Sequence, residues 1–206
     1  MSHFMDVLKG RRSIRKYDPE VKISREEMEE ILTEASLAPS SLNLQPWRFL
    51  VIESPEAKAK LAPLAKFNQS QVQTSSAVIA VFADLESHTY AEEIFTKSVE
   101  LGIMPEEVKE RQIQSISKIY STLPEQINKE LTLVDSGLVS MQLMLAAKAH
   151  GYDTNPIGGF EKDQIAEAFD MDKDRYVPIM LISIGKADEE GYQSYRLPVD
   201  TIAQWK

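Results

Sequence analysis

Residues 124–149 constrain the fold of this chain most strongly, because their helical pattern continues for about 26 residues, or roughly 39 Å of helix. Apolar side chains cover nearly the whole circumference of this helix, namely Leu131, Val134, Leu138, Val139, Met141, Leu143 and Leu145. A helix that is apolar on all sides is buried. We therefore expect the central helix of a domain or a helix in a subunit interface, ended by Gly151 just after its C-cap.

Three apolar runs are expected to form strands. Residues 77–83 read AVIAVFA, as in a strand covered on both faces, and shorter runs occupy residues 47–52 and 177–184. Helical spacing or helix-start signals mark further helices at residues 4–9, 24–35, from 54 onward, 89–121 with breaks at Gly102 and Pro105, and 162–169. No repeat or linker divides the chain, so a single α+β domain is predicted over residues 1–206. The tail, residues 192–206, is expected to dock on another surface.

Composition excludes several classes of protein. The 206 residues include no cysteine and carry a net charge of −9, so disulfides and thiol chemistry are absent and a nucleic-acid partner is not expected. No apolar run reaches the ~20 residues of a membrane span, and the first residues do not resemble a signal peptide. A soluble, cytoplasmic protein is predicted. His3, His88 and His150 are too dispersed for a metal site, and no side-chain nucleophile or acid–base pair stands out.

Basic residues gather at one place in this acidic chain: Lys9, Arg11, Arg12, Arg15 and Lys16 lie within eight positions. The guanidinium group binds phosphate through paired, charge-assisted hydrogen bonds. In an extended segment Arg11, Ser13 and Arg15 would point to the same side and could converge on one ligand. The alternative interpretation is a solvated basic turn between two helices.

Two loops and the tail hold further candidates. Residues 38–47 are rich in short polar side chains and prolines between a helix and a strand, and Asn43 could address a ring edge of mixed donors and acceptors. In residues 155–160 the paired glycines would let the backbone approach a flat ligand. Arg196 is a lone tail arginine. Taken singly, each is also compatible with an ordinary turn or a surface charge.

Taken together, these segments resemble the flavin mononucleotide (FMN)-dependent nitroreductase family. Their motifs are Arg-Arg-Ser-Ile-Arg-Lys-Tyr, Ala-Pro-Ser-Ser-x-Asn-x-Gln-Pro-Trp, Pro-Ile-Gly-Gly-Phe and Arg-Leu-Pro, in that order over residues 4–198. The resemblance implies a nitroreductase-like α+β fold with a central mixed sheet surrounded by helices. It also implies a homodimer with the long helix and two FMN sites in the subunit interface.

The resemblance assigns residues to the cofactor: Arg11, Arg12, Ser13, Arg15, Pro39, Ser40, Ser41, Asn43, Asn68, Gln71, Pro156, Ile157, Gly158, Gly159 and Arg196. The basic segment and Arg196 would hold the phosphate and the pyrimidine side, and residues 39–43 would come from the partner subunit. The backbone of residues 156–159 would face flavin N5 and O4. Gln71 departs from relatives that carry a cation there, which leaves the reduction potential open, although Arg15 could compensate.

The implied reaction has two steps: NADH or NADPH reduces the flavin and leaves, and a nitroaromatic, quinone or related small molecule is then reduced in its place. Tyr90, Phe95 and Tyr120 are candidates to line the acceptor pocket, although aromatic residues at helical spacing usually pack in cores. The alternatives are a non-catalytic FMN storage or sensor protein and a flavin reductase, azo reductase or dehalogenase of the same fold. A purely helical interaction protein is disfavoured by the strand-like runs. The acceptor, the role of oxygen and the choice of nicotinamide stay open.

Overall fold

A four-stranded sheet lies at the centre of the computed structural model, which describes residues 3–206. Its order is β1 (Trp47–Ile52), β2 (Ala77–Asp84), β4 (Tyr176–Gly185), β3 (Asp153–Ile157). All three neighbouring pairs are antiparallel. The prediction of an α+β fold is confirmed, but the mixed sheet is corrected. Within the described residues, the only parallel pairing is an isolated bridge between Ser13 and Thr154.

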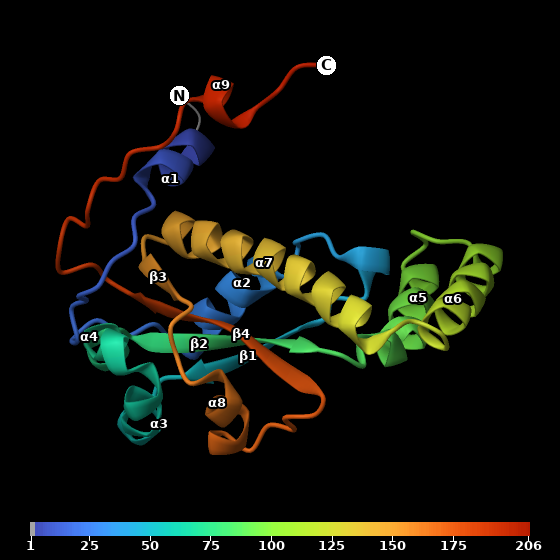
Figure 1. Cartoon of the computed structure of the whole chain (residues 1–206), viewed down its shortest axis with the longest axis horizontal. Helices are drawn as coiled ribbons and strands as arrows, with labels where there is room; N and C mark the ends of the chain where they lie inside the picture. Colours follow the sequence, from blue (N-terminus) through green and yellow to red (C-terminus); the bar gives the residue numbers. More distant parts are fainter. Residues whose placement is uncertain (1–2) are drawn as a thin grey trace.

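β2 is buried along its whole length, as its apolar run predicts. Alternate side chains of a strand point to opposite faces. Ala77, Ile79 and Val81 pack with α2 (Arg25–Ala35) and α7 (Glu125–Ala149) on one face. The intervening residues pack on the other face, where α3 (Pro55–Leu61), α4 (Gln69–Thr74) and α8 (Lys162–Ala168) lie (Figure 1). The sheet is therefore the middle layer between two groups of helices.

The long helix α7 runs across one face of the sheet (Figure 1). It ends as predicted at Gly151, which has φ +84°, and Tyr152 N–H donates to the carbonyl of Ala147 at 2.9 Å. Only one side of α7 is buried in this chain. Its other side exposes a row of apolar side chains, namely Ile127, Leu131, Leu133, Val134, Leu138 and Met141. By length and composition α7 could span a membrane, but its packing on the sheet is that of a core helix.

The remaining elements frame this core. α1 (His3–Gly10) lies near the end of α7, and α5 (Ala91–Glu100) and α6 (Glu106–Tyr120) form a hairpin at the opposite end of the molecule (Figure 1). Three 3₁₀ turns occupy Ser41–Asn43 (η1), Ala62–Asn68 (η2) and Ser87–Tyr90 (η3). The tail contains only the short α9 (Val199–Ile202), and Tyr195 and Trp205 are 80% and 86% exposed. The large apolar side chains of the tail from Tyr195 onward are exposed and do not pack into the core.

Strand β3 is a further correction, because the sequence predicts a glycine-containing loop there. Pro156 lies within β3, opposite Ile182 of β4. Proline is tolerated because β3 is an edge strand, where one side of the backbone needs no ladder donor. Only Gly158 and Gly159 continue beyond the strand as the expected loop.

Candidate functional site

Basic residues from opposite ends of the chain line one small cavity of about 190 Å³. Its lining consists of Arg11, Arg12, Ser13 and Arg15 from the N-terminal segment and Tyr192, Gln193, Ser194 and Arg196 from the tail. The segment is extended, as predicted, because Ile14 N–H donates to the carbonyl of Thr154 at 3.1 Å and Ser13 pairs with the same residue. Four arginines and two serines thus line a space whose composition suits an anion.

The tail is fastened to the basic segment by short contacts. Arg15 N–H donates to Glu189 Oε1 at 2.5 Å, and the Arg15 guanidinium lies 5.2 Å from the centre of the Tyr192 ring. Gly191 has φ +72°, a conformation that favours glycine, and a Cβ there would also lie 2.9 Å from Ile14 Cδ1. The Arg12 guanidinium donates to the carbonyls of Lys9 and Arg11 and therefore supports the backbone of the turn.

Two predicted amide residues lie beside this segment. Gln71 is 5% exposed, and its Nε2 donates to Asn68 Oδ1 at 3.0 Å, while Asn68 Nδ2 lies 3.4 Å from the carbonyl of Gly159. Between them on α4, Ser70 Oγ donates to the carbonyl of Arg15 at 3.1 Å. The structure therefore brings Asn68, Gln71 and Gly159 together and ties them to the basic segment.

The segment from Pro156 to Gly159 is divided between the sheet and the surface. Ile157 is 2% exposed and pairs with Leu181, so its side chain belongs to the core. Gly158 and Gly159 are exposed, and no atom lies within 4 Å of a Cβ built on either residue. The backbone after β3 is therefore open to a flat ligand.

The predicted loop Pro39, Ser40, Ser41 and Asn43 lies elsewhere on the chain. Ser41 N–H and Oγ bind the carboxylate of Asp135, whereas Gly10 of the basic segment lies against Lys148. These contacts are 13 positions apart on α7, which is about 20 Å along a helix axis. A single chain thus does not bring the loop and the basic cavity together.

The loop has an unusual backbone. Leu42, Asn43 and Gln45 have φ values of 54°, 56° and 46°. Residues other than glycine seldom adopt a positive φ, and such strain concentrates at functional sites. Gln45 N–H donates to Ser40 Oγ at 3.0 Å, which closes the turn.

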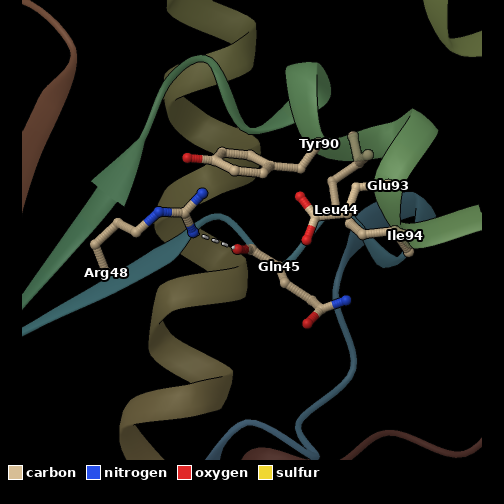
Figure 2. A pocket seen from close by; sticks show the side chains of 6 residues that line it. All are labelled: Leu44, Gln45, Arg48, Tyr90, Glu93 and Ile94. Atoms are coloured by element: carbon tan, nitrogen blue, oxygen red, sulfur yellow. Dashed lines mark hydrogen bonds between the residues drawn. The ribbon is translucent and has the colours of Figure 1, made fainter. Parts of the chain in front are cut away.

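A cavity of about 280 Å³ adjoins this loop (Figure 2). Leu44, Gln45, Arg48, Tyr90, Glu93 and Ile94 line it. The Arg48 guanidinium lies 4.6 Å from the centre of the Tyr90 ring and donates to the carbonyl of Gln45 at 3.0 Å (Figure 2). Tyr90 thus forms part of the wall of this cavity.

The other two aromatic candidates lie outside this cavity. Phe95 is 5% exposed and packs with Leu44, Ala91 and Ile116, which agrees with the alternative of core packing. Tyr120 stacks on His88 with ring centres 4.5 Å apart and lines a separate cavity of about 570 Å³. The three candidates therefore do not form one pocket in this chain.

Two buried carboxylates organise the surroundings of the loop. Asp84 is fully buried and binds Arg48 at 2.9 Å and Arg175 at 2.7 and 2.8 Å, which raises the pKa of Arg175. Asp135 is 4% exposed; its burial raises the pKa of the carboxyl, and the hydrogen bonds from Ser41 oppose that rise. Among the described residues no group of three or more His, Asp or Glu side chains could hold a metal ion.

Sequence reasoning missed several residues of these sites. Tyr192, Ser194 and Ser70 carried no signal, because only the tertiary structure brings them to the basic segment. Asp135 did carry one: it is the only acidic residue in the otherwise apolar stretch 131–147 of the long helix. A charged side chain in such a position is seldom buried without a partner.

The chain is similar to known proteins over nearly its whole length. The model of the "Nitroreductase family" matches residues 8–186. "Putative NAD(P)H nitroreductase YdgI" of Bacillus subtilis (strain 168) is 69% identical over 98% of this chain and 97% of its own length. The "CLA biosynthesis enone reductase" of Lactiplantibacillus plantarum is 37% identical over 95% and 91%, respectively. A "putative nitroreductase in complex with FMN" from Exiguobacterium sibiricum 255-15 matches with a TM-score of 0.97 and 64% identity, over 100% of this chain and 98% of that chain.

The fold and these matches define an α+β oxidoreductase. The chain belongs to the nitroreductase family. The resemblance inferred from the motifs is thereby confirmed.

Proposed function

We propose that this chain is an FMN-dependent oxidoreductase that takes hydride from NADH or NADPH and reduces a nitroaromatic, quinone or related acceptor in a second step. The observation that carries the proposal is the convergence of Arg11, Arg15 and Arg196 on one cavity, next to the amides of Asn68 and Gln71. A phosphate group and a polar ring edge are what these two donor sets fit.

The residues of this chain fit FMN as a cofactor. Arg11, Arg12, Ser13, Arg15 and Arg196 would hold the phosphate, and Asn68 and Gln71 would bond the polar edge of the ring. Pro156, Ile157, Gly158 and Gly159 would present backbone to the ring, and the open surface over both glycines supports this assignment. When bound, FMN supplies the carrier for two electrons and a proton.

We propose further that the working form is a homodimer with each FMN in the subunit interface. Pro39, Ser40, Ser41 and Asn43 would then reach the cofactor of the partner subunit, because they lie about 20 Å along α7 from the basic segment of their own chain. The exposed apolar row of α7 and the exposed apolar side chains of the tail support an interface at this face.

The chain's own residues bind, orient and exclude water, and we assign no side chain a proton-transfer step. The arginines hold the anionic end, and Asn68 and Gln71 fix the orientation of the ring. Tyr90 and Ile94 would bound the place where nicotinamide and acceptor bind in turn. The enone reductase named above suggests that activated alkenes belong among the acceptors to be tested.

The net charge of −9 supports a protein that works without a nucleic-acid partner, and we propose a single domain over residues 1–206 acting in the cytoplasm. A storage or sensor protein would bind FMN through the same residues, and turnover with NADH or NADPH separates it from an enzyme.

Reconstitution of the apoprotein with FMN and with riboflavin tests the assignment of the basic cavity. Riboflavin lacks only the phosphate, so its dissociation constant should be at least 100-fold higher than that of FMN, in line with the loss of two charge-assisted hydrogen bonds. Equal affinity for the two flavins would contradict the proposed phosphate site.

A further inference from the structure

The strained loop from Ser40 to Gln45 is held at one end by the buried carboxylate of Asp135 and at the other by the partly buried guanidinium of Arg48. It carries Ser41 and Asn43, which we assign to the cofactor of the partner subunit. A backbone with three residues at positive φ reverts to easier conformations unless its surroundings hold it. The groups that hold the loop therefore determine whether Ser41 and Asn43 are in position to bind.

At the first end, the loop is bound by the carboxylate of Asp135, one of the buried residues of α7. It accepts Ser41 N–H at 3.0 Å and lies 3.2 Å from Ser41 Oγ. Both bonds are charge-assisted, and such bonds are about twice as strong as neutral ones. Asp135 has no cationic partner among the ion pairs of the described residues, so Ser41 is its principal hydrogen-bond partner.

At the second end, the loop is bound by the guanidinium of Arg48. Its Nη1 donates to the carbonyl of Gln45 at 3.0 Å (Figure 2). The same atom donates to the carbonyl of Trp47 at 2.7 Å, and Nη2 lies 2.9 Å from Asp84. The same group underlies the Tyr90 ring (Figure 2). Because Asp84 is fully buried and also binds Arg175, the position of Arg48 is fixed from behind.

We propose that Asp135 and Arg48 are positioning residues, which hold Ser41 and Asn43 in the strained conformation that binds the cofactor across the subunit interface. Arg48 additionally couples this loop to Tyr90 and so to the cavity in which we expect the acceptor. The inference rests on the proposed FMN site. It adds two residues that preorganise the loop contributed to that site by the partner subunit.

A double-mutant cycle on Ser41 and Asp135 tests whether their hydrogen bonds position the loop. Ser41→Ala, Asp135→Asn and the double variant are purified, stripped of flavin and titrated with FMN. We expect each single variant to raise the dissociation constant about tenfold, the scale of one charge-assisted bond. The double variant should lose less than the sum of the two single losses, because both changes affect the bond between Ser41 Oγ and the Asp135 carboxylate, whereas the bond from Ser41 N–H remains in Ser41→Ala. A purely structural role of Asp135 would give additive losses.

Thr132→Val is the matched control. Thr132 is also a buried polar residue of α7, but its hydroxyl donates to the carbonyl of Lys129 and not to the loop. Its FMN affinity should equal that of the wild type. Ser41→Ala changes a partly exposed side chain and serves alone if Asp135→Asn does not fold; unchanged FMN affinity in Ser41→Ala overturns the proposal.

Arg48→Lys tests whether the hydrogen bond from Arg48 to the Gln45 carbonyl positions the loop, and Arg175→Lys is its control. Lysine keeps the positive charge beside Asp84 but cannot serve two carbonyls and a carboxylate in one plane. We expect about tenfold weaker FMN binding and a raised KM for the acceptor in Arg48→Lys only. An equal loss of FMN affinity in both variants would show that the binding depends on the ion pairs of Asp84 and not on the contact between Arg48 and the loop. That result would overturn the proposed role of Arg48. A wild-type protein that binds no FMN would instead reject the proposed function.

Discussion

Arg11 and Arg196 line the same small cavity, although they come from opposite ends of the chain. The N-terminal segment is held by a bridge from Ser13 to Thr154, and the tail by the bond between Arg15 and Glu189. Neither segment could build this cavity alone. In an acidic chain, such a local concentration of cations indicates a specific anionic ligand rather than general attraction.

The double variant Arg11→Ala, Arg15→Ala should purify largely free of flavin, because two guanidinium groups would no longer meet the phosphate. Flavin content per protein, from the visible and ultraviolet absorbance, measures the effect. Arg25→Ala is the control, since Arg25 forms an exposed ion pair with Glu29 on α2. A double variant that retains a full complement of FMN would remove the phosphate assignment.

Gln71→Lys should raise the reduction potential of the bound flavin by an amount on the order of 30 mV, which corresponds to about 1.4 kcal/mol for two electrons. A cation near the ring edge stabilises the reduced, anionic cofactor better than a neutral amide does. Redox titration against reference dyes measures the change. Gln73→Lys places the same charge on the exposed side of α4 and should leave the potential unchanged. A potential that falls or stays constant in Gln71→Lys would refute the placement of Gln71.

Leu138→Glu should prevent formation of the proposed homodimer and lower the flavin content with it. Leu138 is 44% exposed in the middle of the apolar row of α7, and a carboxylate there could not be buried in a subunit interface. Sedimentation or light scattering gives the mass in solution. Leu101→Glu makes the same change at the tip of the α5–α6 hairpin and should remain dimeric. A Leu138→Glu dimer with full flavin would place the interface elsewhere.

Lys58→Met should stabilise the protein near pH 7 by about 1 kcal/mol. Burial lowers the pKa of Lys58 to about 8 from 10.5, so charging this lysine costs about 3 kcal/mol, against about 2 kcal/mol for its lost charge-assisted bond to the carbonyl of Ser75. A lowered lysine pKa means that wild-type stability increases as pH rises from 8 to 10.5. The advantage of the variant should therefore shrink over that range in denaturant titrations.

Lys60→Met on the exposed side of the same helix is the control and should show neither effect. If Lys58→Met is less stable than the wild type at every pH, the buried lysine is a net stabilising group and the argument from burial is wrong.

Long, regular elements were predictable from the sequence. The apolar run of β2 and the pattern of α7 are found close to their predicted bounds, and the helix breaks at Gly102 and Pro105 separate α5 from α6. Strand β3 was not predicted, because its five residues include Pro156 and show no alternation of apolar and polar side chains. The antiparallel order of the sheet depends on contacts far apart in sequence, which local patterns do not encode.

The candidate site was predictable only where motifs mark it. Arg11, Arg15 and Arg196 were named from motifs, and their common cavity follows in the structure. The roles of Arg48 and Asp135 depend on which loop carbonyl or amide each one meets, and spacing along the chain does not specify this. Phe95 could not be told apart from Tyr90 by pattern, because both lie in one helical region and only packing decides which side chain faces a cavity.

Anaerobic reduction of the purified protein separates an FMN-dependent oxidoreductase from a protein that only binds FMN. The purified protein should be yellow, and its flavin absorbance should bleach when NADH or NADPH is added without oxygen. The absorbance should then recover when a nitroaromatic or a quinone is added. A protein that is yellow but is bleached by neither donor would be a storage or sensor protein. A protein that stays colourless and cannot be reconstituted with FMN would contradict the account as a whole.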